Sequence, residues 1–235
     1  MLIRPMTLCA ALAVVASLAA INPAATRAQT VGSPPSRVIL PASAIDVRYV
    51  DIDGDRRRDT VTITPGSGSV RITVVTATKL RATRTLAVST DAPFYGTGRI
   101  DGARGAEILV DVNYYELRVL RWRKGRLVDE PVAQSSVYAG GRVVTRRAWA
   151  IRGDTTSWWN TYRLFTSRGV RYLDAASLYC GSCQATGVYD KVTIVRSRWK
   201  SKAWRKVKVI VHRKVSQKKA EAHYLNEFSG VKVTK

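Results

Sequence analysis

Four carboxylates lie within nine residues of an otherwise strongly basic chain, in the segment Asp51-Ile52-Asp53-Gly54-Asp55-Arg56-Arg57-Arg58-Asp59. The acids occupy positions 1, 3, 5 and 9, and Gly54 at position 4 permits a tight backbone turn. Carboxylate oxygens that converge on one point are the hard ligands that Ca²⁺ prefers. Because four unpaired carboxylates repel one another at such distances, a divalent cation supplies the missing counter-charge. The alternative is a solvated acidic turn that pairs with the three neighbouring arginines.

The flanks of this loop indicate a β context. The loop is not an EF-hand, because an EF-hand needs Gly at position 6 and Glu at position 12, where this chain has Arg56 and Thr62. Residues 47–50 precede the loop as a short strand, and residues 60–63 alternate with period 2 after it. We therefore expect the metal loop to connect two β-strands.

The pattern Asp-x-Asp-Gly-Asp-x-x-x-Asp followed by an alternating strand resembles the calcium loop of the FG-GAP, VCBS-type repeat, the blade unit of integrin-α-like β-propellers. The family has Gly after the third Asp, where this chain has Arg56. The resemblance extends at most from Tyr49 to Arg123. It implies that side-chain oxygens of four acids and one backbone carbonyl bind Ca²⁺, from Asp51, Asp53, Asp55, Asp59 and Arg57 respectively.

A second copy of the loop follows at an offset of 48 residues, where residues 99–110 align under residues 51–62. Asp101 and Glu107 fall under the second and fourth acids, but Arg99 and Ala103 replace the first and third. We expect no metal there, and Arg99 can instead bridge Asp101 and Glu107. A period of about 40–50 residues is typical of propeller blades. The sequence therefore predicts an all-β fold of propeller-like antiparallel blades, in a small or incomplete propeller.

A third unit without an acidic loop is expected from Gly141 to Leu173. Its aromatic residues could form a stacking platform, but aromatic side chains in strands more often fill the core between sheets. Adjacent residues of a strand face opposite sides, so one of Trp158 and Trp159 is the better candidate for an exposed contact. The aromatic residues of this unit are Trp149, Trp158, Trp159, Tyr162 and Tyr172.

The first 28 residues predict a secretory signal peptide. Arg4 precedes an apolar run over residues 6–20, and Thr26 and Ala28 suit positions −3 and −1 of a cleavage site. Residues 29–44, rich in Pro and Gly, are expected to form a flexible leader before the β repeats of residues 45–187. The mature protein is therefore expected to be secreted or held at the cell surface, with no transmembrane segment once the signal is removed.

Cys180 and Cys183 are the two cysteines that follow the signal. A redox motif would require a βαβ setting, and a zinc site would require further ligands that His212 and His223 do not supply at a suitable spacing. We expect a short-range disulfide that pins a surface turn in an oxidising compartment.

Positive charge is concentrated in residues 188–235, which hold 14 Lys/Arg against 3 Asp/Glu, while the whole chain has a formal net charge of +22. Residues 188–198 and 204–214 predict a β-hairpin whose cations share one face, opposite Val192, Ile194, Val207 and Val209. Such a face suits a polyanion: a cell-wall polymer, lipid headgroups, an acidic polysaccharide or extracellular DNA. A plain solubilising surface is the alternative. The candidate polyanion-binding residues are Arg196, Arg198, Lys200, Lys202, Arg205, Lys206 and Lys208.

A short helix is expected over Gln217–Phe228, with Ser216 as its N-cap and Gly230 after its end. It is expected to pack against the final β unit through Ala220, Tyr224 and Leu225.

No catalytic motif is evident, since the sequence lacks a Gly-x-Ser-x-Gly elbow, a His-Glu-x-x-His helix and a Gly-rich phosphate loop. The sequence therefore favours a secreted, calcium-stabilised, non-enzymatic module that binds a surface ligand such as an anionic polymer or a protein. One alternative is a secreted hydrolase whose acids, Glu107, Asp111 and Glu116, lie on strand ends. Another places the basic hairpin as a DNA-binding or membrane-active element.

Overall fold

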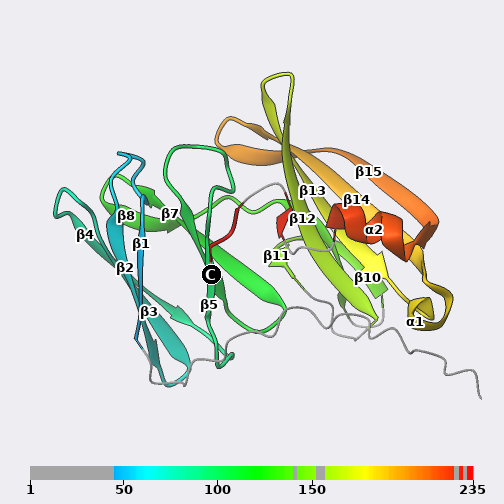
Figure 1. Ribbon diagram of the computed structural model, residues 1–235, viewed down its shortest axis with the longest axis horizontal. Coiled ribbons are helices and arrows are strands. Elements are labelled where there is room, and N and C mark those ends of the chain that lie inside the picture. Colours follow the sequence, from blue (N-terminus) through cyan, green and yellow to red (C-terminus); the bar gives the residue numbers. More distant parts are fainter. Residues whose placement is uncertain (1–44, 140–141, 152–156, 225–227, 230–231, 235) are drawn as a thin grey trace, which may run out of the picture. The chain divides into compact units, whose positions relative to one another are not determined.

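The computed structural model describes residues 45–139, 142–151, 157–224, 228–229 and 232–234. The expected signal peptide and leader, residues 1–44, lie outside the described residues. Antiparallel strands dominate the described chain and do not close into a barrel (Figure 1). The all-β prediction is confirmed, while the arrangement of the sheets as propeller blades stays a prediction. The described helices are too short and too polar to cross a bilayer.

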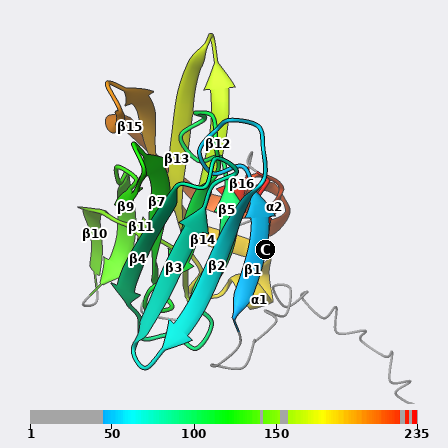
Figure 2. The same cartoon turned by 90° about the vertical axis from the view of Figure 1, so that its left-hand side faces the viewer.

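The first sheet is an antiparallel meander of four strands in sequence order (Figure 2). It alternates between buried and half-buried residues, as in β2, where Val61 and Ile63 are buried and Thr60 and Thr62 are half-buried. One face is therefore apolar and the other polar, as period 2 requires. Its strands are β1 (Asp46–Val50), β2 (Asp59–Gly66), β3 (Ser69–Val75) and β4 (Arg81–Ala87).

The second sheet repeats this meander. β1 and β5 begin 48 residues apart, at positions 46 and 94, and β2 and β6 do so at positions 59 and 107. The predicted offset therefore relates matching strands, and both acidic segments connect the first two strands of their sheets. β7 pairs along its free edge with both β8 and β11. The strands are β5 (Phe94–Gly98), β6 (Glu107–Asp111), β7 (Glu116–Arg123), β8 (Arg126–Asp129) and β11 (Trp149–Ala150).

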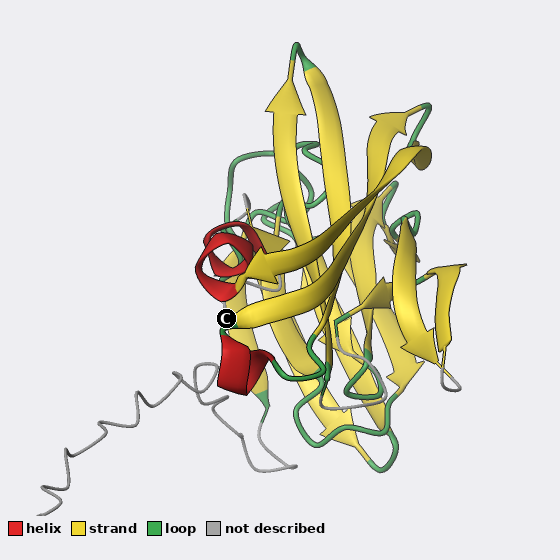
Figure 3. Ribbon diagram, turned by 90° about the vertical axis from the view of Figure 1, so that its right-hand side faces the viewer, coloured by secondary structure: helices red, strands yellow, loops and turns green. Residues whose placement is uncertain are grey.

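The third sheet has the order β15-β14-β13-β12-β16, with long antiparallel strands and β16 parallel to β12. Figure 3 shows both helices, in red, against these strands. A separate hairpin joins β9 (Gln134–Ala139) to β10 (Arg142–Arg147). The elements of the third sheet and its helices are β12 (Trp158–Ser167), β13 (Val170–Tyr179), α1 (Cys183–Thr186), β14 (Val188–Lys200), β15 (Ala203–Ser216), α2 (Gln217–Tyr224) and β16 (Phe228–Ser229).

β13 and β14 lie on either side of the expected boundary between residues 187 and 188, and they pair in the third sheet from Tyr172↔Arg198 to Tyr179↔Lys191. The division of the chain into β repeats and a basic segment stays a prediction. The C-terminal helix does not extend to Phe228, which instead pairs with Tyr162 in β16 and is buried. Packing of the Phe228 ring against the core therefore overrides the helical pattern of the preceding residues.

The second sheet is buried on both faces. Ile108 and Val110 of β6 pack with Val61 and Ile72 of the first sheet, whereas Leu109 packs with Leu173 of the third. All five residues of β6 are buried, which explains why its sequence is a continuous apolar run between two acids. The three sheets therefore share two apolar cores, one on each side of the second sheet.

The aromatic residues of the expected third unit mostly fill the core. Trp149, Trp158 and Tyr162 are buried, as predicted, and Tyr162 contacts both Trp149 and Phe228. Trp159 is 37% exposed, on the face of β12 opposite Trp158. Tyr172 is half-buried on the outer face of the third sheet.

The two repeated loops contact each other directly. The Ala106 backbone N–H donates a hydrogen bond of 2.8 Å to the Asp51 carbonyl. Gly105 has φ +87° and lies so close to the Ile52 carbonyl that a Cβ there would clash with backbone. The absence of a side chain at Gly105 therefore brings the second loop against the acidic loop.

Replacement of Gly105 by Ala is expected to destabilise the fold by about 2 kcal/mol or more beyond the cost of the left-handed φ alone, because rigid backbone must move. Chemical denaturation of the variant measures this loss. Gly125→Ala is the matched control, since Gly125 has φ +76° with no atom within 4 Å of the added Cβ. Equal losses in the two variants would show that the contact between the loops contributes nothing.

Candidate functional site

Asp59, the first residue of β2, organises the acidic loop. Its carboxylate is fully buried and accepts backbone hydrogen bonds from Ile52 (2.7 Å), Asp53 (3.2 Å) and Ala77 (2.9 Å). Ala77 belongs to the turn between β3 and β4, so this one side chain connects the loop to the neighbouring turn at the same end of the sheet. Asp59 therefore holds the backbone of the loop through three hydrogen bonds.

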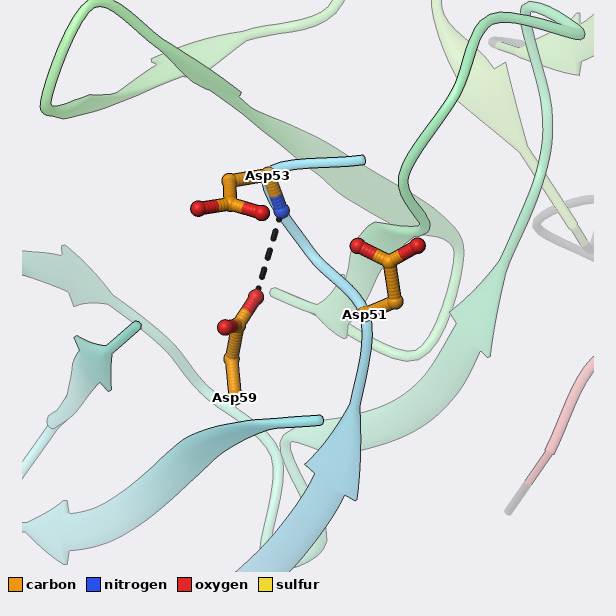
Figure 4. A group of neighbouring side chains, drawn as sticks. All are labelled: Asp51, Asp53 and Asp59. Carbon is orange, nitrogen blue, oxygen red and sulfur yellow. Dashed lines mark hydrogen bonds between the residues drawn. The ribbon is translucent and has the colours of Figure 1, made fainter. Parts of the chain in front are cut away.

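Asp51 and Asp53 complete a group of carboxylates with Asp59 (Figure 4). Ligand oxygens of the three side chains all lie within 4.8 Å of one another. Burial raises the pKa of Asp53 above its usual range, and repulsion by Asp59, Asp55 and Asp51 raises it further, against a backbone hydrogen bond that lowers it. Burial and the neighbouring carboxylates therefore both oppose ionisation of Asp53.

The remaining predicted ligands lie at the exposed tip of the loop. Asp55 is exposed and accepts a hydrogen bond of 2.7 Å from the Arg57 backbone, so it lies outside the close group of three. Arg56 adopts φ +70°, the left-handed conformation that Gly adopts most readily. The backbone at Arg56 therefore adopts a conformation that suits glycine, although an arginine occupies the position.

The acidic loop could hold a metal ion. Each carboxylate oxygen has two lone pairs, so an oxygen that accepts one backbone N–H retains capacity for a cation. The oxygens of Asp51, Asp53 and Asp59 are hard ligands of the kind that Ca²⁺ and Mg²⁺ prefer. The three carboxylates supply hard oxygen donors, and the repulsion among them would be relieved by a divalent cation.

A second group of carboxylates lies at the matching place in the second sheet and could also hold a metal ion. Asp101, Glu107 and Glu130 are all buried, and Glu107 accepts a 2.6 Å hydrogen bond from the Ile100 backbone, as Asp59 does from Ile52. The arginine beside this group is Arg121, which lies 3.5 Å from Asp101 and 3.1 Å from Glu130. The expectation that Arg99 bridges the acids is corrected, because Arg121 reaches them from β7.

Sequence reasoning missed Glu130, which follows β8 and lies 23 residues after Glu107. Burial, and next repulsion by Asp101, raise the pKa of Glu107 to about 9, while the same two causes raise the pKa of Glu130 to about 8 against the attraction of Arg121. Arg121 pairs with two of these acids, and the half-buried Arg171 also interacts electrostatically with Asp101 and Glu107, so three buried acids face two arginines. The protonated forms of both Glu side chains are therefore favoured in the folded protein.

The acids considered for hydrolysis do not come together. Glu107 and Asp111 lie at opposite ends of β6, which at a rise of about 3.3 Å per residue separates them by about 13 Å. Asp111 accepts backbone hydrogen bonds from Asn113 and Tyr114, and Glu116 pairs with Arg146. These three residues therefore do not form a carboxylate pair around one bond.

The predicted Cys180–Cys183 disulfide is confirmed, with Cα atoms 5.1 Å apart. It lies in the connection between β13 and β14, and both cysteines are buried. The two strands are antiparallel neighbours, so the setting is not βαβ, and the bond closes a turn.

The predicted basic hairpin is confirmed as β14 and β15, but its faces differ from the expectation. Val192, Ile194 and Arg196 alternate on one face of β14, and Arg196 pairs directly with Lys208. Val192 and Ile194 therefore share a face with Arg196 and Lys208, since side chains with period 2 and directly paired residues point to the same side. Val207 and Val209 lie on β15 and are about half exposed (48% and 49%).

Most of the candidate cations lie on the outer face of the third sheet, and a register shift after Arg196 brings Arg205 to that face, opposite Arg198. Lys206 pairs with Ser197 on the inner face, and Lys202 lies in the hairpin turn. Directly paired positions on β12 and β13 extend the outer face to Arg163, which sequence reasoning missed. We call this set of residues the basic face: Arg163, Arg196, Arg198, Lys200, Arg205 and Lys208.

Two aromatic residues lie among these cations. Phe165 and Tyr172 form a directly paired position of β12 and β13, with ring centroids 5.4 Å apart and planes 15° from parallel. The guanidinium groups of Arg163 and Arg196 lie 5.4 and 5.1 Å from the Phe165 centroid. The period-2 pattern of each strand could have grouped Arg163 with Phe165, but only the pairing of strands brings Tyr172 beside them.

The one acid paired within the basic face is Asp174, among the residues that the structure describes. It is fully buried and receives two hydrogen bonds of 2.7 Å from Arg196. Arg198, Lys200, Arg205 and Lys208 are exposed. The exposed part of the face is therefore cationic.

Comparison of the chain with models of protein families, with curated proteins and with solved structures finds no match. The resemblance to the FG-GAP repeat accordingly stays a prediction that depends on the acidic loop and the 48-residue offset.

The folded state is expected to lose stability as the pH rises from 5 to 9 in the presence of EDTA. The raised pKa values of Glu107 and Glu130 mean that the folded chain retains protons that the unfolded chain releases above about pH 4.5. Each fully linked proton gives a slope of about 1.4 kcal/mol per pH unit. Urea unfolding at several pH values should show Glu107→Gln with a clearly shallower slope and a higher stability at pH 9.

Glu116→Gln is the control, because Glu116 is a partly exposed carboxylate of the same sheet. It should retain the wild-type dependence on pH. A wild-type protein equally stable at pH 5 and pH 9 would contradict the expectation.

Proposed function

We propose that this chain is a secreted, non-enzymatic, calcium-stabilised β-repeat protein that binds an anionic polymer at a cell surface. The observation that carries the proposal is the basic face, where cationic side chains from three strands, β12, β14 and β15, lie on one side of a sheet. The chain as a whole is strongly basic, with a net charge of +22. Like charges held this close raise the local potential, which attracts a polyanion and speeds its association.

The fixed geometry of the basic face favours binding over mere solubility. Arg196 is held by both oxygens of Asp174, and two guanidinium groups are packed on the ring of Phe165. Side chains that are ordered before binding lose less conformational entropy when they bind. Solubilising lysines on a surface need no such support.

The calcium ion has a structural role in this proposal. Asp51, Asp53 and Asp59 would hold it, and it would neutralise the repulsion among their carboxylates. The same residues connect β1, β2 and the turn after β3, and the Asp51 carbonyl accepts the hydrogen bond from the second loop. Binding of an ion to the folded state alone stabilises that state.

Calcium is expected to raise the melting temperature of the protein by about 5–10 °C at 100 times its Kd, which corresponds to about 2.7 kcal/mol. Asp53→Asn, which keeps the side-chain shape and removes the charge, should abolish most of this shift. Asp91→Asn is the control, because Asp91 is an exposed acid outside the loop. Thermal melts in EDTA and across a calcium titration measure the effect. A shift that persists unchanged in Asp53→Asn would rule out the acidic loop as the calcium site.

Removal of three exposed cations from the basic face is expected to weaken binding to heparin, used as a model polyanion. The variant Arg198→Gln/Lys200→Gln/Arg205→Gln should elute from a heparin column at a clearly lower salt concentration than wild type, since each lost contact reduces the salt-dependent term of binding. Its matched control removes three exposed arginines from the first and second sheets, as Arg71→Gln/Arg81→Gln/Arg126→Gln. Equal shifts in the two variants would show that net charge alone governs binding.

A further inference from the structure

We propose that the polyanion of the basic face is a single-stranded nucleic acid, whose bases stack at the Phe165–Tyr172 pair while its phosphates contact the surrounding cations. This inference rests on the proposed function, since it names the class of polymer that the same face binds. Proteins that bind single strands without sequence preference combine a cationic path for the backbone with aromatic side chains for successive bases. Both components lie together on this face.

The first observation in favour of a single strand is the position of the aromatic pair. Phe165 and Tyr172 lie on the outer face of the third sheet, away from the core that contains Tyr162 and Leu164 on the opposite side of β12. Both rings keep part of their surface exposed. Core packing, which accounts for Trp149 and Tyr162, therefore does not account for this pair.

The outer face of the third sheet is divided between two environments. In one half, Ala176, Leu178, Val192 and Ile194 pack with Ala220 of α2. The other half carries the aromatic pair and the exposed cations instead. The helix thus buries the aliphatic half and leaves the cationic side chains in solvent.

The second observation is that aromatic rings and guanidinium groups, on which bases can stack, lie together. The two rings are nearly parallel, and the guanidinium groups of Arg163 and Arg196 lie over the Phe165 ring, so four flat groups lie together. Nucleobases stack on aromatic rings and on arginine planes. A polymer with charge but no flat ring, such as polyphosphate or a glycerol-phosphate chain, gains nothing from them.

The third observation is the spacing of the cations beside the aromatic pair. Successive cations of one strand face, such as Arg196, Arg198 and Lys200, are about 6.6–6.8 Å apart at a rise of 3.3–3.4 Å per residue. They run beside the rings on the adjacent strands, so one extended strand can contact both. In a duplex the bases stack on each other and are not accessible to the rings, so a single strand fits this face better.

The test measures the affinity of the full mature chain for a fluorescein-labelled dT15 oligonucleotide, a 15-base-pair duplex and heparin. Phe165→Leu/Tyr172→Leu should lower the affinity for dT15 by about fivefold or more, because stacking is worth about 1–3 kcal/mol per base. Its affinity for heparin should stay within twofold of wild type. Tyr49→Leu/Tyr115→Leu, which removes two exposed aromatic rings elsewhere, is the matched control and should leave dT15 binding unchanged.

The outcomes separate this inference from the proposed function. Wild type that binds neither dT15 nor heparin at physiological salt overturns both. Wild type that binds heparin and loses this binding in Arg198→Gln/Lys200→Gln/Arg205→Gln, but binds dT15 equally in the aromatic variant, overturns the inference alone. Equal affinity of wild type for dT15 and for the duplex also overturns it. Circular dichroism and urea unfolding of Phe165→Leu/Tyr172→Leu verify that the variant is folded, and Tyr172→Leu alone provides a milder change with the same expected direction.

Discussion

Packing of the second sheet on both of its faces is the interaction on which the other features depend. Ile108 and Val110 contribute to one apolar core and Leu109 to the other, so the first and third sheets are each held by the same short strand. A strand buried on both faces cannot alternate between apolar and polar residues. Its polar residues are displaced to its ends, and this is where Glu107 and Asp111 lie.

The acidic groups follow from this arrangement. Asp59 and Glu107 begin equivalent strands, and each accepts a hydrogen bond from the backbone seven residues earlier. In the first sheet the carboxylates lie at a half-exposed edge, where an ion can reach them. In the second sheet, burial and Arg121 change the environment, and the Glu107 carboxyl takes up a proton at pH values where an ordinary glutamate is ionised. Two loops of the same kind therefore differ in how their negative charge is offset, and the difference depends on how deeply the carboxylates are buried.

The third sheet has one face in the stack and one facing outward. Its inner face supplies Tyr162, Leu173 and Trp204 to the core, while its outer face is divided between α2 and the basic face. Because side chains alternate between the two faces with period 2, the cations of the basic face point away from the core. The bulge after Arg196 changes which residues of β15 face outward near the hairpin turn. Lys206 lies on the inner face there, and Arg205 lies on the outer face.

The sequence by itself determined what depends on local spacing: the β content, the acidic turn before β2, the 48-residue offset, the hairpin of residues 188–216 and the short-range disulfide. Strand pairing and burial decided the rest, because they join residues with no fixed separation along the chain. Glu130 and Arg121 complete the second acidic group from after β8 and from β7, and Tyr172 meets Phe165 only across two strands. Phe228 lies in a strand and not in the expected helix because its ring packs on Tyr162 in the core, a contact between residues far apart in the chain. Local pattern specifies which elements form, whereas tertiary packing specifies which side chains share an environment and so which chemistry they can perform.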